Sequence, residues 1–290
     1  MEKKKILLTG ASGTIGQQIL KSDLRKEYYF QCLFRTDFTD IGGDKNIIIK
    51  NWSKASLENI LEETDTIIHL ASSTKALASG QSHAESFELT KMLVEVANKA
   101  SVKNFVFFSS DLASQPNGNY GKYKLKSEEV ITKNFKHNWL IVRCSPVWVR
   151  DQPSSNSTVY KLIDSVKKQR LIILPNGGRF TVTPIWIDDL VDNLRYALDK
   201  EEISSMVMEL KGDPIEIREL LEKVSDRYSV ETRIVSIPLW LLKFCTKSIM
   251  LLGCNLTIFE TLLDIGEKTD FPRPTNEIKR TKINDILKRV

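Results

Sequence analysis

A short strand pattern that runs into three spaced glycines lies near the start of this 290-residue chain. The apolar run 6–8 leads into Thr9-Gly10-Ala11-Ser12-Gly13-Thr14-Ile15-Gly16, and a helical spacing of apolar residues follows. Glycines let the backbone turn tightly and approach phosphates, and a helix N-terminus offers unpaired N–H groups to negative charge. We therefore predict a dinucleotide-binding turn whose contacts come from Gly10, Ser12, Gly13, Thr14, Ile15 and Gly16. An ordinary tight turn between a strand and a helix is the alternative.

The composition is that of a globular protein, with 41% hydrophobic and 27% charged residues. The net charge of +5, from 42 basic against 37 acidic residues, suits a small anionic ligand. It is too small and too scattered for a nucleic-acid surface, so we expect a small-molecule substrate and no nucleic-acid partner. The four cysteines form no C-x-x-C pair and the three histidines lack metal spacing, so we predict no metal site. Free thiols without a signal peptide lead us to expect a cytoplasmic protein.

Apolar runs of strand length alternate with helical patterns through the first half of the chain. Strands are expected at 5–9, 30–34, 46–50, 66–70, 104–108 and 139–142, and helices at 14–21, 56–61, 84–99 and 120–133. This alternation predicts an α/β fold in which helices cover both faces of a doubly wound, Rossmann-type parallel sheet. The runs are nearly continuous in apolar residues, as in strands buried on both faces.

Two polar segments, 111–119 and 150–158, are expected to be loops. After the second the alternation becomes less regular. We expect residues 1–150 to form the nucleotide-binding domain and residues 151–290 to form mostly a smaller substrate lobe, with some elements returning to the sheet.

Tyr120 and Lys124 are four residues apart on a predicted helix, so they share a face. An ammonium group beside a phenol favours the phenolate and lowers the pKa of the tyrosine. Ser110, at the end of the preceding strand, is placed to hold a carbonyl oxygen beside that phenol. We predict that these three residues are catalytic; the alternative is a tyrosine–lysine pair on a helix surface. Tyr123 has Ser127 and no lysine at the corresponding position.

Six motifs together resemble the short-chain dehydrogenase/reductase superfamily, in its extended, epimerase/dehydratase-like branch. They are Thr9-Gly10-x-x-Gly13-x-x-Gly16, Asp65-Thr66-Ile67-Ile68-His69-Leu70-Ala71, Phe107-Phe108-Ser109-Ser110, Tyr120-Gly121-x-x-Lys124-x-x-x-Glu128, Val142-Arg143-Cys144-Ser145-Pro146-Val147-Trp148 and Pro184-Ile185-Trp186-Ile187-Asp188-Asp189-Leu190. They occur in the family's order from residue 4 to about 198. The resemblance implies an NAD(P)-dependent oxidoreductase, epimerase or dehydratase that acts on a carbonyl or a secondary alcohol.

The resemblance also implies a role for each matched position. Tyr120 would be the general acid/base, Lys124 would bind the nicotinamide ribose and tune Tyr120, and Ser110 would polarise the carbonyl. Leu70, Ala71 and Ser72 would line the cofactor, and Cys144, Ser145 and Pro146 would lie near the nicotinamide. Relatives often dimerise through the helices expected here at 84–99 and 120–133, which implies a homodimer.

Arg35 ends the second predicted strand, where NAD-preferring relatives place an acidic residue on the adenosine ribose. A carboxylate accepts hydrogen bonds from the free 2′-hydroxyl, whereas a guanidinium pairs with a 2′-phosphate. We therefore expect NADP in preference to NAD. A solvated arginine at the strand end, with Asp37 turned inward, is the alternative.

The chain departs from the family pattern in two places. The segment between Ser110 and Tyr120 is shorter than in sugar-nucleotide epimerases, and residues 176–180 do not reproduce the family's nucleotide-sugar signature. Both departures argue against a nucleotide-sugar substrate and leave the cofactor site untouched.

Residues 237–263 are strongly apolar but are interrupted by lysines and by Gly253-Cys254-Asn255. No uninterrupted apolar run reaches the ~20 residues of a transmembrane helix. We expect two amphipathic helices that form part of the lobe, a lid or a dimer face, with attachment to a membrane surface as the alternative.

Two readings without turnover remain open. One is a cofactor-sensing regulator similar to NmrA-like proteins, which keep the glycine motif and lose the tyrosine chemistry. The other is a scaffold that binds nucleotide structurally and contacts a partner through its apolar segment. Because Ser110, Tyr120 and Lys124 are retained together, we favour the enzyme.

Overall fold

The computed structural model describes residues 3–35, 42–50, 52–72, 80–114, 116, 118–149, 158–168, 171–200, 203–238 and 280–289. The chain packs as two compact units. The first comprises Met1–Cys144 and Leu190–Leu210, and the second comprises Ser145–Asp189 and Lys211–Val290.

The first unit is built on a seven-stranded sheet whose strands are all parallel. The strand order is β11-β6-β5-β4-β1-β2-β3. The strands are β1 (Lys5–Thr9), β2 (Tyr29–Phe34), β3 (Lys45–Ile48), β4 (Thr66–His69), β5 (Asn104–Ser110), β6 (Asn138–Cys144) and β11 (Met206–Leu210). The order reverses between β1 and β4, which is where open α/β sheets bind their ligands.

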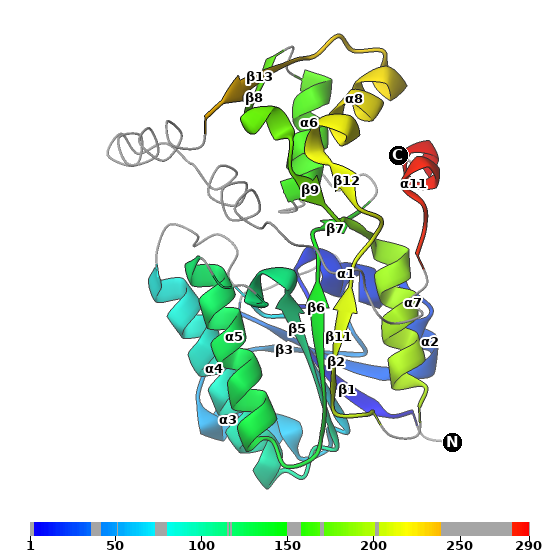
Figure 1. The fold of residues 1–290 in the computed structure, drawn as a ribbon. Helices are drawn as coiled ribbons and strands as arrows, with labels where there is room; N and C mark the ends of the chain where they lie inside the picture. Colours follow the sequence, from blue (N-terminus) through cyan, green and yellow to red (C-terminus); the bar gives the residue numbers. More distant parts are fainter. Residues whose placement is uncertain are drawn as a thin grey trace. The chain divides into compact units, whose positions relative to one another are not determined.

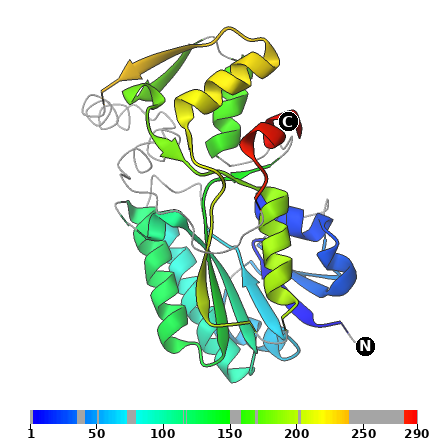
Figure 2. The ribbon, with the colours of Figure 1, turned by 45° about the vertical axis from the view of Figure 1, so that its right-hand side comes forward.

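Helices cover both faces of this sheet (Figure 1). One face carries α3 (Lys54–Leu61), α4 (Gly80–Lys99) and α5 (Asn119–Asn134). The other face carries α1 (Thr14–Lys21), α2 (Leu24–Glu27) and α7 (Ile187–Leu198), as the turned view in Figure 2 also shows. The prediction of a doubly wound, Rossmann-type α/β fold is confirmed.

The central strand β5 shows why a continuous apolar run is needed here. Phe105 and Phe107 point to the side of α4, where they join a core cluster with Leu93 and Val96 of that helix. The alternate residues of β5 are also buried, because the sheet is covered on both sides. A strand with one polar face would leave one of these layers without a core.

The described part of the second unit contains three two-stranded pairings. They are β7 (Val147–Trp148) with β10 (Ile185–Trp186), β9 (Thr181–Val182) with β12 (Ile215–Glu216), and β8 (Leu171–Pro175) with β13 (Arg233–Ile237). It also contains the short helix η2 (Asn176–Gly178), two packed helices, α6 (Thr158–Lys168) and α8 (Ile217–Tyr228), and α11 (Ile283–Arg289).

Some elements differ from the sequence-based expectations. The segment expected as a loop at 111–119 begins with a short 3₁₀ helix, η1 (Asp111–Ala113), because the Ser110 side chain caps it. The seventh strand, β11, was not expected, since its residues are mostly half-exposed at the sheet edge and include Glu209. Residues 239–263 of the apolar segment lie outside the described residues. Of the helices in the described part of the chain, none has the length and apolar character that a bilayer crossing requires.

A buried ion pair fastens α5 to β5 and β6. Arg143 of β6 donates three hydrogen bonds to Glu128 of α5, from Nε to Oε1 at 3.0 Å and to Oε2 at 3.2 Å, and from Nη2 to Oε2 at 2.6 Å. Ser109 of β5 donates a fourth, from Oγ to Oε1 at 2.5 Å. Glu128 is 3% exposed, so its charge is held by these four contacts and not by water.

We expect Glu128→Ala to lower the free energy of unfolding by about 3–5 kcal/mol, because Arg143 and Ser109 lose their buried acceptor. The neighbouring Glu129 provides a matched control, since its pair with Lys133 at 3.2 Å is exposed. Glu129→Ala should cost less than about 1 kcal/mol. Urea unfolding measures both variants, and equal losses would show that the Glu128 pair is not structural.

Candidate active site

The turn after β1 requires glycine at two positions. Gly10 has a φ of +73°, and a Cβ there would lie 2.7 Å from the backbone nitrogen of Ala71. A Cβ on Gly16 would lie 2.5 Å from the carbonyl oxygen of Gly10. Real Cβ atoms do not approach backbone this closely, so β1, α1 and the end of β4 meet only because these side chains are missing.

The N-terminus of α1 begins directly after this turn. Gly13 is its N-cap and has no side chain to occupy the first N–H groups of the helix. The Gly13 N–H donates to the Gly10 carbonyl at 3.0 Å, which closes the turn. Ser12 and Gly13 are exposed, and Thr14 and Ile15 are half-buried. Such an open helix start, reached by backbone alone, fits the diphosphate of a dinucleotide.

A buried hydrogen-bond network joins the ends of β1 and β4 to α4. The Ala71 N–H donates to Thr9 Oγ1 at 3.3 Å, and that hydroxyl lies 2.6 Å from His69 Nδ1. On the far side of the ring, His69 Nε2 lies 3.0 Å from Thr90 Oγ1. Thr90 donates its own proton to the Ser86 carbonyl at 3.0 Å. Thr90 can therefore only accept from the ring, which assigns the His69 proton to Nε2 and makes Nδ1 the acceptor from Thr9.

Lys124 of α5 is buried, with 6% of its surface exposed. Its Nζ donates to the carbonyl oxygen of Phe108 at 2.7 Å and lies 4.7 Å from the ring centre of Phe107. The Nζ is 5.8 Å from the ring centre of Tyr120. Burial lowers the pKa of Lys124 to about 8. The ammonium form therefore persists at neutral pH, close to a phenol on the same helix face.

Tyr120 is half-buried beside Lys124, and its pKa is raised above the ordinary value. Burial is the main cause of the raised pKa, followed by the nearby Cys144 and Asp111, and the neighbouring Ser72 side chain opposes them. The expected lowering of this pKa by Lys124 is not found. The reason is that loss of solvent around the hydroxyl outweighs the favourable contacts.

The two serines at the end of β5 have different partners. Ser109 is committed to Glu128, as described above. Ser110 is 8% exposed, accepts from the Leu112 N–H at 3.3 Å and donates to Asp111 Oδ1 at 3.3 Å. These two hydrogen bonds are long and therefore weak. Of the two serines, Ser110 is the one whose hydroxyl can exchange its partners for a substrate oxygen at a small loss of free energy.

The remaining residues expected at the site lie at the ends of their strands. Leu70, Ala71 and Ser72 follow β4 and are half-buried, and Arg35 follows β2 and is exposed. Cys144 ends β6, and its thiol donates to the Ser109 carbonyl at 3.4 Å.

Ser145 and Pro146 belong to the second unit. Ser145 Oγ lies 2.8 Å from Thr183 Oγ1, and the Pro146 carbonyl accepts from the Ile185 N–H at 3.1 Å. Both contacts hold the second unit together.

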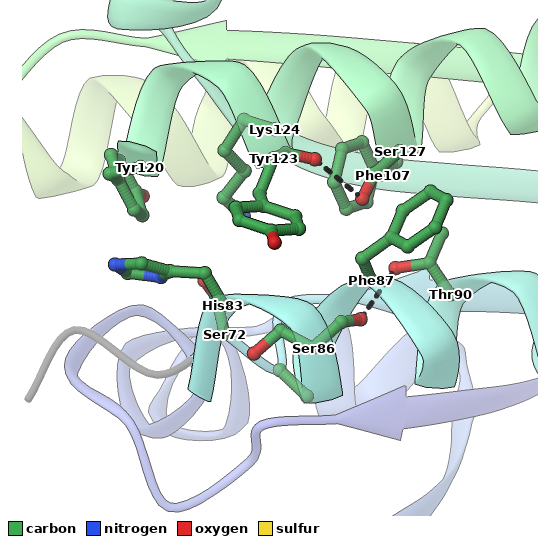
Figure 3. Close-up of a pocket in the computed structure, with 11 residues that line it drawn as sticks. Ser72, His83, Ser86, Phe87, Thr90, Phe107, Tyr120, Tyr123, Lys124 and Ser127 are labelled. Atoms are coloured by element: carbon green, nitrogen blue, oxygen red, sulfur yellow. Dashed lines mark hydrogen bonds between the residues drawn. The ribbon is translucent and has the colours of Figure 1, made fainter. Parts of the chain in front are cut away.

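A small cavity lies between α4 and α5, beside Tyr120 (Figure 3). Its lining includes Ala71 and Ser72 after β4, four residues of α4 and four of α5, among them Tyr120 and Lys124. The volume is about 10 Å³, room for about one water molecule. Sequence reasoning missed His83, which lines this cavity from α4. No spacing in the sequence distinguishes this histidine from a surface one.

A family model described as "NAD dependent epimerase/dehydratase family" matches residues 6–207. Among curated proteins, the chain is 24% identical over 264 residues to a protein of Bacillus subtilis (strain 168) named "Uncharacterized UDP-glucose epimerase YtcB". The match covers 77% of this chain and 83% of that protein.

Solved structures with the same fold include two sugar-nucleotide epimerases. One is a UDP-glucose 4-epimerase from Thermotoga maritima with UDP-glucose, at a TM-score of 0.67 and 17% identity, covering 81% of this chain and 85% of that one. The other is a UDP-glucuronic acid 4-epimerase from Bacillus cereus in complex with NAD, at a TM-score of 0.69 and 19% identity, covering 81% and 87%. At these identities the likeness concerns the fold.

His69 predicts how stability depends on pH. Burial lowers its pKa to about 3, whereas the unfolded chain takes up this proton near pH 6.5. The unfolded state therefore gains protons first, and the contribution of His69 to stability falls from pH 6.5 toward pH 3. At pH 5 the loss is about 2 kcal/mol.

We expect His69→Gln to reduce the drop in unfolding free energy between pH 7 and pH 5 by that amount. The exposed His137 supplies the control, since His137→Gln should keep the wild-type drop. Urea titrations at both pH values measure it. An unchanged drop in His69→Gln would contradict the assignment.

Proposed function

The chain belongs to the NAD-dependent epimerase/dehydratase family and is an enzyme of the extended short-chain dehydrogenase/reductase type, and we propose that Tyr120, Lys124 and Ser110 carry its chemistry. The proposed reaction begins with oxidation of a secondary alcohol, or reduction of a carbonyl, on a small substrate. The relatives named above support the reaction class, and the geometry around Tyr120 supports the choice of residues.

One observation carries this proposal: Tyr120 lies beside the residues that the glycine turn contacts. Gly10 packs against the backbone of Ala71, and Ser72, the next residue, lines the same cavity as Tyr120. The turn that fits a diphosphate and the phenol that fits an acid/base are therefore linked through two residues after β4. A helix-surface tyrosine would have no such connection.

The residues present fit a nicotinamide dinucleotide. Gly10, Gly13 and Gly16 open the backbone to its diphosphate, and Ala71 and Ser72 form a wall beside the turn. When bound, this cofactor supplies the hydride acceptor or donor of the reaction. We propose NADP in preference to NAD because Arg35 offers an exposed guanidinium at the end of β2.

In the proposed mechanism Tyr120 moves the proton. Its phenolate oxygen takes the proton from the substrate alcohol as the carbon loses hydride, and the phenol formed in this way returns the proton when hydride comes back. Lys124 stabilises the phenolate through its charge, which it keeps below about pH 8. Ser110 donates to the substrate oxygen after its long contact with Asp111 is released.

We propose sugar nucleotides as the substrate class. The relatives named for UDP-glucose and UDP-glucuronic acid support this choice. The short segment before Tyr120 argues against it in the sequence. The first part of that segment forms η1 and α5 begins at Asn119, so its shortness is compatible with a formed site.

Tyr120→Phe is expected to lower kcat about 100-fold or more, because the proton transfer loses its group. Binding of the dinucleotide should remain within about twofold of wild type. Tyr123 lies on the same helix and lines the same cavity, so Tyr123→Phe is the matched control and should retain most activity. Turnover of UDP-sugars and fluorescence binding of NADPH measure the two effects. Dinucleotide binding without turnover of any sugar nucleotide, ketone or quinone by the wild type would favour a cofactor-sensing protein.

Arg35→Ala should weaken NADPH binding about 10- to 100-fold, the value of a charge-assisted hydrogen bond to phosphate, and leave NADH binding nearly unchanged. Arg25 is also exposed but lies in α2, before β2 begins, so Arg25→Ala should alter neither affinity. Calorimetry with both cofactors gives the comparison. Equal losses for NADPH and NADH would refute the preference for NADP.

A further inference from the structure

His83 lies in the first turns of α4 and is 2% exposed. Its Nε2 is fully buried and has no hydrogen-bond partner among the described residues. Buried imidazole nitrogens normally have partners, because an unpaired polar group in the interior is costly. An orphaned nitrogen of this kind points to a contact that forms with a water molecule or a ligand.

The position of His83 indicates which group this contact would involve. Its ring centre is 5.7 Å from that of Tyr120, at an interplanar angle of 60°. Figure 3 shows His83 on α4 facing Tyr120 and Tyr123 on α5 across the small cavity. The cavity has room for about one water molecule, and Ser72 and Ser86 are also among its lining residues. A water here would lie among residues that carry hydroxyl groups.

Proton affinities show which role His83 can take. The ordinary pKa values of tyrosine and histidine are about 10 and 6.5, so a proton moves from phenol to imidazole only against a large difference. In this structure the pKa of Tyr120 is raised and that of His83 is lowered, in each case mainly by burial. The gap is therefore wider than usual, and His83 stays neutral. His83 is therefore too weak a base to take the phenol proton, and it acts on Tyr120 by hydrogen bonding.

We propose that His83 is a positioning residue whose Nε2–H donates, through one water molecule in this cavity, to the Tyr120 hydroxyl. The inference rests on the proposed role of Tyr120 and adds a donor to its phenolate form. Donors to a phenolate stabilise the charged state and so bring the tyrosine closer to the form that accepts a proton. Ser72, which follows β4, and Lys124 of α5 line the same cavity.

Other titratable groups face this pair and remain constant in the test. They are Lys124 and Tyr123 on α5, Asp111 on η1 and Cys144 on β6. His83→Phe keeps an aromatic ring between α4 and α5, whereas His83→Gln keeps an N–H donor near the position of Nε2. The two variants separate packing from hydrogen bonding.

The first experiment needs no turnover. The chain has three histidines, so ¹⁵N-histidine NMR resolves His83 once His83→Gln identifies its signals. We expect a proton on Nε2 in the wild type and a changed shift and faster solvent exchange of that proton in Tyr120→Phe. A deprotonated Nε2, or a signal that Tyr120→Phe leaves unchanged, overturns the proposal even if the proposed function fails.

The second experiment uses the sugar nucleotide that the wild type turns over. His83→Phe should lower kcat at pH 7 about tenfold, with KM changed less than twofold, and move the rising limb of the pH profile up by about one unit. His83→Gln should restore kcat to within about threefold. A His83→Phe variant with an unmoved limb, or a His83→Gln variant as impaired as His83→Phe, shows that the ring only packs.

Discussion

Close approach of backbone to backbone at the glycine turn is the constraint on which the rest of the site depends. Gly10 and Gly16 leave no room for a side chain between the end of β1, the start of α1 and the residues after β4. Any Cβ at these points would push α1 away from the sheet or move Ala71. Because Ser72 follows Ala71 and lines the same cavity as Tyr120, such a shift would also change the surroundings of the phenol.

In the parallel sheet, the carboxyl ends of strands that are far apart in the sequence lie side by side at one edge. In register, Ser110 of β5 pairs with Cys144 of β6, and His69 of β4 pairs with Phe107 of β5. The residues after these strands therefore emerge together, although they are tens of positions apart in the chain. The helices α4 and α5 pack side by side over this edge and bring Tyr120 to it. The position of the site thus follows from strand order, and its chemistry follows from which side chains end each strand.

Much of this was readable from the sequence, and the limits have physical causes. Continuous apolar runs identified six strands of the main sheet, and the four-residue spacing placed Tyr120 and Lys124 on one helix face. The predicted direction of the Tyr120 pKa shift was wrong. Residue spacing shows which side chains are neighbours, but it does not show how far folding removes the hydroxyl from solvent. Spacing also could not show that Lys124 is tied to the Phe108 carbonyl. The edge strand β11 was not predicted because most of its residues are partly exposed and do not form a continuous apolar run.

The network of Thr9, His69 and Thr90 has a consequence for how this protein can vary. Each hydroxyl and each ring nitrogen already has its one matching donor or acceptor. Serine in place of either threonine conserves that count, because it keeps the hydroxyl, whereas other single replacements leave a buried group without a partner. Apart from exchange between threonine and serine, evolutionary drift at this junction is therefore expected to proceed by paired exchange, so that the three positions covary among homologues.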